Sequence, residues 1–178
     1  MKRPVWLLDI DGVINALANE YPTQIWPQGQ WVTVHMDFGS EGTVRVDAAE
    51  PVLEFIRKVH AKRAAEIRWH TTWQKEALRL AEALDLPELW VQEAAYEFDN
   101  REDYLRRDKW WKYPAAWRVV GQEKRPLVWT DDDIVDLVQR DVNSLASAGQ
   151  TLLIAPTSTY GLTKQQLGRI AEFLDVDL

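Results

Sequence analysis

Two aspartates near the start of the chain, Asp9 and Asp11, have the residue type and spacing that point most directly to chemistry. They stand at the end of the apolar run 5–10, and Gly12 follows them. Side chains two residues apart in an extended backbone lie on the same side of it, so we expect the two carboxylates to converge. Converging carboxylates repel each other and are costly to bury, and a hard divalent cation relieves both costs. The spacing therefore predicts a metal and a reaction at the carboxyl end of a strand.

The same residues have two other interpretations. Asp-x-Asp-Gly is an ordinary way to leave a strand, because aspartate and glycine favour turns. Calcium loops share the pattern, but they need further oxygen ligands and a glutamate at a fixed distance. Here Val13, Ile14 and Asn15 follow the glycine. The motif alone leaves a turn, a cation loop and a catalytic pair open.

A second candidate group follows the apolar run 67–70, where Thr71 and Thr72 come directly before a helical pattern. Two threonines in this place are also a normal pair of helix N-caps, and that alternative stays open. His70, at the end of the run, is typical of a packed core histidine. Either threonine is a candidate for the site, and Thr71 is preferred.

An acidic cluster at 131–133 follows the apolar run 127–130, and Asp136 lies just beyond it. One aspartate there favours the start of a helix through the helix dipole, but three in a row are more than capping needs. Lys109 and Lys112 lie in the helical stretch before that run, where each alone is typical of a surface residue. Ligands of open α/β sheets bind at the carboxyl ends of strands, which is where these groups fall.

The elements that must position these groups alternate along the chain. Five apolar runs are typical of strands, at residues 5–10, 67–70, 89–91, 127–130 and 152–155. Apolar residues recur at helical spacing at 51–62, 73–84, 109–120, 134–148 and 163–174, with a break expected near Pro114. The alternation predicts an α/β fold, a three-layer Rossmann-like parallel sheet with helices on both faces.

Residues 31–46 depart from this alternation. Their apolar residues recur at period two around the segment 39–42, which contains two glycines, and this is the signature of a β-hairpin. Because the hairpin comes soon after the first aspartates, we expect it to form a flap over the carboxyl ends of the strands. The chain between Asp11 and Thr71 holds only this hairpin and one helix, so we expect no separate cap domain and an open site.

The composition sets outer limits on fold and function. A chain of 178 residues fits one domain, expected over 1–178. There is no cysteine, which excludes disulfides, thiolate catalysis and sulfur-ligated zinc. The net charge of −7 disfavours a general nucleic-acid coat but allows binding to one phosphorylated end.

The sequence also bears on location. No apolar run approaches the roughly 18 residues of a membrane span. The basic start of the chain is followed by a short apolar stretch that Asp9 and Asp11 interrupt, which does not fit a secretory signal. We therefore expect a cytoplasmic protein without a membrane partner. The sequence leaves the oligomeric state open.

In chain order, these groups resemble the motifs of the haloacid dehalogenase (HAD) superfamily, most of whose members are phosphatases. The stretch 9–12, Asp-Ile-Asp-Gly, resembles the first motif, Thr71 the second, Lys112 the third, and Asp131 with Asp132 the fourth. The resemblance covers nearly the whole chain. The stretches 69–73, 111–112, 129–132 and 160–163 are also similar to a small capless group that includes the HAD domains associated with RNA-repair proteins.

The resemblance implies a magnesium-dependent (Mg2+) phosphoric monoester hydrolase that works through an aspartyl-phosphate. Asp9 is then the nucleophile, and Asp11 protonates the leaving oxygen and later takes a proton from water. Magnesium is implied at Asp9, the backbone carbonyl of Asp11 and Asp131, with Asp132 nearby.

The remaining roles are implied in the same way. Thr71 binds a phosphate oxygen, Lys112 stabilises negative charge and orients the nucleophile, and Gly12 lets the chain turn beneath the phosphate. Three alternatives stay open: Thr72 for Thr71, Lys109 for Lys112, and Asp136 for a share of the metal. Two alternatives of function also stay open, a polynucleotide-end phosphatase and a non-catalytic phosphate-binding module on the same fold.

Overall fold

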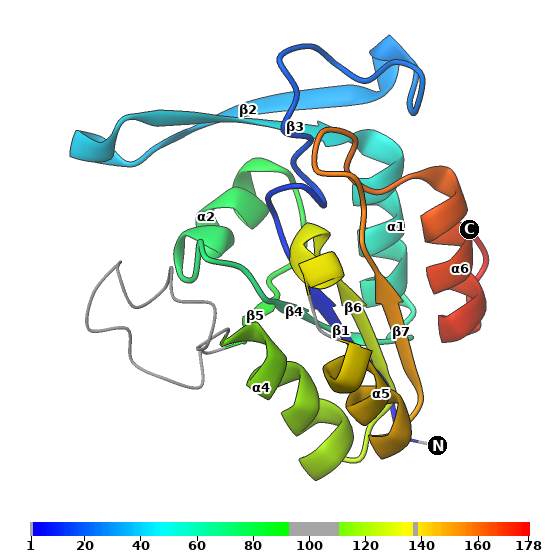
Figure 1. Cartoon of the computed structure of the whole chain (residues 1–178). Coiled ribbons are helices and arrows are strands. Elements are labelled where there is room, and N and C mark those ends of the chain that lie inside the picture. The colour runs from blue at the N-terminus through cyan, green and yellow to red at the C-terminus, as the bar shows by residue number, and fades with distance from the viewer. Residues whose placement is uncertain (1, 93–110, 137–138) are drawn as a thin grey trace.

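The computed structural model describes residues 2–92, 111–136 and 139–178 (Figure 1). Its main sheet has five parallel strands in the order β5-β4-β1-β6-β7. These strands are β1 (Val5–Leu8), β4 (Glu66–Trp69), β5 (Trp90–Val91), β6 (Leu127–Thr130) and β7 (Thr151–Ile154). Every residue of the central strands β1 and β6 is buried, as a parallel sheet with two covered faces requires.

Helices cover both faces of this sheet, so the predicted α/β fold with three layers is confirmed (Figure 1). Val5 and Leu7 of β1 pack with α4 (Lys112–Trp117) and α5 (Gln139–Ala148). The alternate side chains, Trp6 and Leu8, belong to the core on the other face. The helices there are α1 (Glu50–Ala61), α2 (Glu76–Ala83) and α6 (Lys164–Leu174).

Local sequence explains where the helices of the second face begin. Pro51 lies in the first turn of α1. Backbone N–H groups there make no hydrogen bond within the helix, so a proline, which lacks this group, fits without cost. Thr163 caps α6, because its hydroxyl accepts a hydrogen bond from the backbone N–H of Gln166, whose side chain accepts one in return from the Thr163 N–H. Both helices bury one apolar face against the sheet, and this confirms the helical periodicity read from the sequence.

Two predicted helices differ in detail. Pro114 does not break its helix, because it lies in the first turn of α4 and leaves no hydrogen bond unmade. The helix instead widens to a π-turn at Arg118–Gln122. In the stretch predicted at 134–148, the described residues form the end of a 3-10 turn, Asp132–Asp136, and the helix α5.

The predicted hairpin is present as β2 (Trp31–Asp37) and β3 (Thr43–Ala49), a separate antiparallel pair that extends three residues beyond the predicted 31–46. Its Met36 and Val46 point into the core. The backbone of β3 also holds the loop that follows β1, since the Ala16 N–H donates to the carbonyl of Asp47 at 3.0 Å. The hairpin, hereafter the flap, is therefore fixed to the segment that carries the first aspartates (Figure 1).

None of the helices in the described part of the chain is long and apolar enough to cross a membrane.

Candidate active site and metal centre

The two central strands place aspartates at one edge of the sheet. Asp9 directly follows β1 and Asp131 directly follows β6, and the Asp9 N–H donates to the Thr130 carbonyl at 3.1 Å. The chain leaves β1 toward β4 and leaves β6 toward β7, on opposite sides. Ligands of doubly wound sheets bind at such a switch point, outside the carboxyl ends of the strands.

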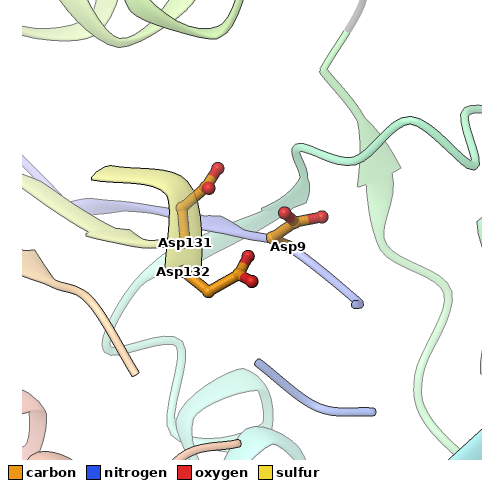
Figure 2. Close-up of side chains that lie close together, drawn as sticks. All are labelled: Asp9, Asp131 and Asp132. Atoms are coloured by element: carbon orange, nitrogen blue, oxygen red, sulfur yellow. The ribbon is translucent and has the colours of Figure 1, made fainter. Parts of the chain in front are cut away.

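Three carboxylates meet at this point. Asp9, Asp131 and Asp132 each offer an oxygen atom, and these atoms lie within 4.8 Å of one another (Figure 2). Asp9 and Asp131 are 5% and 0% exposed, while Asp132 is half-buried. Carboxylates so close together in a buried place need a compensating charge.

Part of that charge comes from Lys112, the first residue of α4. Its ammonium group is buried and donates hydrogen bonds to Asp9 Oδ2 at 2.5 Å and to Asp131 Oδ2 at 2.7 Å. Three carboxylates and one ammonium still leave two negative charges when all four groups are ionised. One divalent cation would neutralise these two remaining negative charges.

The shifts in pKa reflect this excess of negative charge. Burial raises the pKa of Asp9 to about 7, although Lys112 acts in the opposite direction. Burial, with Asp133 and Asp9 as like charges, raises the pKa of Asp132 to about 6. Burial would lower the pKa of Lys112, but the neighbouring Asp9 and Asp131 carboxylates outweigh it and raise that pKa. Lys112 is thus a fixed cation, and the three carboxylates together carry more charge than it can balance.

These residues fit a hard divalent cation such as Mg2+. All the available ligand atoms in the group are oxygens, which magnesium prefers, and the group carries the charge that such an ion would balance. Asp9, Asp131 and Asp132 would hold it. The Asp11 carboxylate is not part of this group.

Asp11 lies apart because the strand ends at Leu8, three residues before it. The chain then turns, with the N–H groups of Ile14 and Asn15 both donating to the Ile10 carbonyl at 2.9 Å. Asp11 Oδ1 accepts a hydrogen bond from Asn15 Nδ2 at 2.9 Å, and Oδ2 accepts one from Trp73 Nε1 at 2.8 Å. The convergence expected of Asp9 with Asp11 is therefore found between Asp9 and the aspartates after β6.

Gly12 permits the close approach of Asp132 to this turn. Its φ is +68°, a conformation that residues with side chains rarely adopt. A Cβ at this position would lie 2.3 Å from Asp132 Oδ2, far inside contact distance. The glycine thus has a steric role in the site as well as a conformational one.

The two threonines after β4 are clearly different in the structure. Thr71 is 1% exposed, whereas Thr72 is exposed. Neither residue caps α2, because that helix begins at Glu76 with Lys75 as its N-cap. The Thr71 hydroxyl accepts instead from the N–H of Trp73 at 3.3 Å, within the turn that ends β4.

Two open alternatives lie outside what the structure describes. Lys109 belongs to the stretch 93–110, which is not described. Asp136 closes the 3-10 turn that begins at Asp132, and its side chain is not described either. Lys112 is placed as the sequence predicts, at the carboxylates.

His70 is a packed core histidine, as the sequence predicts, but the sequence does not identify its neighbours. Its ring is fully buried and lies edge-on to the Trp111 ring, with the ring centroids 5.0 Å apart. The centroid of the Trp129 ring lies 5.5 Å away. Neither ring nitrogen has a hydrogen-bond partner among the described residues. Burial, and secondarily the charge of Lys112, lower its pKa well below the usual value, so the ring is neutral. A neutral histidine therefore lies close to the ion pairs of the site.

Sequence reasoning also missed the two donors to Asp11. In the sequence Asn15 counts only against a calcium loop. Trp73 follows the candidate threonines directly, and an indole N–H beside polar groups at a strand end was the available signal.

No family model, curated protein or solved structure matches the chain.

Proposed function

We propose that this chain is a magnesium-dependent phosphomonoester hydrolase of the HAD type, acting through an aspartyl-phosphate. One observation carries the proposal: at the switch point of the sheet, buried Asp9 is paired with Lys112 and grouped with Asp131 and Asp132. A second carboxylate, Asp11, lies two residues beyond Asp9 and outside this group, and we assign it the exchange of protons with the leaving oxygen and with water.

The reaction divides into two displacements on phosphorus. In the first, a carboxylate oxygen of Asp9 bonds to phosphorus while the bond from phosphorus to the leaving oxygen breaks. The electron pair departs on that oxygen, which takes the proton held by Asp11. In the second, the oxygen of a water molecule bonds to phosphorus and the water gives a proton to Asp11, while the bond from phosphorus to the Asp9 oxygen breaks and its electron pair returns to Asp9. Phosphate leaves, and Asp9 is restored as a carboxylate.

The remaining groups bind and orient. Lys112 holds Asp9 Oδ2 and stabilises the negative charge that develops on the phosphoryl group. A bound magnesium ion supplies the further positive charge that lets two anions, carboxylate and phosphate, approach each other. Thr71 is the better candidate for a phosphate oxygen, since it is buried beside the strand end, with Thr72 and the backbone at Gly12 contributing at the rim.

The proposal is tested by phosphate release with magnesium from a panel of substrates. The panel contains an aryl phosphate, nucleotides, sugar phosphates, and RNA and DNA with 3′ or 5′ phosphate ends. Turnover is expected for at least one member and is expected to disappear in Asp9→Asn. Asp11→Asn retains the nucleophile but loses the acid and base, so it serves as a partial-loss control. Activity that survives Asp9→Asn, or tight binding of a phosphate analogue without any turnover, contradicts the proposal.

The RNA and DNA members of the panel decide whether a polynucleotide end is the substrate. This alternative rests on the resemblance alone. A cytoplasmic location is part of the same proposal and is supported by the cysteine-free composition, which suits a reducing compartment.

A further inference from the structure

The Asp11 carboxylate is held by two donors from different parts of the fold. Trp73, in the loop between β4 and α2, donates its indole N–H to Oδ2 at 2.8 Å. Asn15, four residues after Asp11, donates its side-chain amide to Oδ1 at 2.9 Å. Each carboxylate oxygen thus has a fixed donor, and together the two donors define the plane in which the carboxyl group lies.

The tip of the flap supports the first donor. Phe38, at the end of β2, meets the Trp73 ring edge-on with the ring centroids 5.2 Å apart. Arg79 of α2 donates to the carbonyl of Asp37 at 3.0 Å and so fastens the tip to the same region. The indole is therefore packed against the flap on its ring while its N–H is directed to Asp11.

The base of the flap supports the second donor. The backbone N–H of Asp47 in β3 donates to Asn15 Oδ1 at 3.0 Å. The carbonyl of Asn15 accepts from the N–H of Gly12 at 2.9 Å, which closes the turn after Asp11. Asn15 is 3% exposed, so this arrangement is sheltered from water. Both donors to Asp11 are consequently held in place by the flap, one at each of its ends.

We propose that Trp73 is a positioning residue for Asp11, and that the flap acts on the proton-transfer step through it. This inference rests on the proposed function, in which Asp11 gives its proton to the leaving oxygen as the bond from phosphorus to that oxygen breaks. Proton transfer depends on the placement of the acid within hydrogen-bond reach of the leaving oxygen. Trp73 fixes that placement through its hydrogen bond to Asp11 and transfers no proton itself.

The test separates proton transfer from the rest of the reaction by changing the leaving group. An alkyl phosphate leaves as an alkoxide and needs the proton, whereas nitrophenyl phosphate leaves as a stable phenolate and does not. The ratio kcat/KM covers only the steps through formation of the aspartyl-phosphate, so later steps do not mask the effect. Loss of folded protein would lower both values alike.

Trp73→Phe keeps an aromatic ring against Phe38 and removes the indole N–H. The expected result is a fall of about tenfold or more in kcat/KM for the alkyl phosphate, with less than about a threefold fall for nitrophenyl phosphate. Phe38→Leu is expected to lower kcat/KM for the alkyl phosphate more than for nitrophenyl phosphate, by a smaller factor than Trp73→Phe does. It keeps the test valid if Trp73→Phe folds poorly.

Trp31→Phe is the matched control. Trp31 lies in the flap and, like Trp73, donates its indole N–H, but to the carbonyl of Trp26 at 3.0 Å rather than to Asp11. Its substitution should affect both substrates equally. An equal fall for both substrates in Trp73→Phe, or no fall, overturns the inference and leaves the proposed function standing.

A second readout does not depend on activity. In an NMR spectrum of the indole N–H groups, the signal lost in Trp73→Phe should shift in Asp11→Asn. A signal that stays in place shows that the hydrogen bond is absent and overturns the inference. If the wild-type protein hydrolyses neither substrate nor any of the panel, the proposed function fails, and this inference fails with it.

Discussion

The Lys112 ammonium donates a 2.5 Å hydrogen bond to the Asp9 carboxylate, although 103 residues separate them in the chain. Both side chains are buried, at 3% and 5% exposure. A buried pair of this kind contributes little net stability by itself, but removal of one partner leaves an uncompensated charge. The pair therefore makes stability and the candidate chemistry depend on the same two residues.

Lys112→Met is expected to lower the free energy of unfolding of the metal-free protein by about 3–5 kcal/mol at pH 8. The loss should shrink as pH falls. Asp9 already has a folded pKa of about 7 because of burial, against 3.8 in the unfolded chain, so the folded state holds its proton more tightly. That stabilising contribution is complete below the unfolded pKa and disappears as pH rises through the folded one. Without the lysine, which lowers the pKa of Asp9, this stabilising contribution extends to higher pH.

Urea unfolding at pH 6 and pH 8, without metal, measures the difference. Lys112→Arg keeps a positive charge and is the control. Equal losses at the two pH values would show that Asp9 does not carry the buried charge.

Magnesium affinity is expected to weaken as pH falls from 8 to 5. Protons compete with the ion for Asp132, whose pKa burial raises to about 6, and for Asp9, whose pKa it raises to about 7. Calorimetric titration with magnesium should show at least about a tenfold loss of affinity across this range. Asp132→Asn should bind more weakly at pH 8 and show a shallower pH dependence. An affinity that does not change with pH would place the ion elsewhere.

The effect of a methyl group at position 12 can be separated from the effect of backbone conformation. Gly39 has a φ of +66°, nearly the same as Gly12 at +68°, but its Cβ position is open, whereas that of Gly12 overlaps Asp132. Gly39→Ala should cost about 1–2 kcal/mol of unfolding free energy, the ordinary cost of a left-handed residue. Gly12→Ala should cost clearly more and should also weaken magnesium binding. Similar costs for the two variants would mean that Asp132 moves aside freely.

The fold was accessible from the sequence because its signals are local. Period-two and helical patterns gave the strands, the helices and the flap, and the order of the elements gave a parallel sheet. The helix break predicted near Pro114 is wrong, because a proline breaks a helix only in its interior. The periodicity of the sequence does not show that the helix begins at Lys112.

The site was accessible only in part. Asp131 and Asp132 could be placed with Asp9 because parallel strands end at one edge of a sheet. The place of Asp11 could not be predicted, because it depends on the residue at which β1 ends, and a sequence pattern does not define the ends of a strand to within one or two residues. The bond from Trp73 to Asp11 links residues 62 apart in the chain, and no pattern in the sequence reports a contact of that kind.

Acid sensitivity is expected at the opposite end of the sheet. Burial alone would raise the pKa of Glu66, but hydrogen bonds from Arg125 and Arg68 outweigh it and lower the pKa to about 2. The contribution of Glu66 to stability is therefore present above its unfolded pKa of 4.5 and is lost as pH falls through about 2. Unfolding free energies between pH 6 and pH 2.5 should decline less steeply in Glu66→Gln than in the wild type. The exposed Glu172→Gln on α6 should retain the wild-type slope, and a matching change in both variants would contradict this assignment.

The position of β1 at the centre of the sheet also has a consequence for assembly. Val5 pairs with Glu66 on one side and with Leu127 on the other, so its second neighbour lies more than a hundred residues downstream. During synthesis β1, which Asp9 directly follows, is made before β6, so its hydrogen bonds are completed only after β6 has left the ribosome. Closing so long a loop is slow, because its entropy must be overcome before the contacts form. The carboxylates of the site can therefore come together only once β6 has paired with β1, when the two halves of the sheet join.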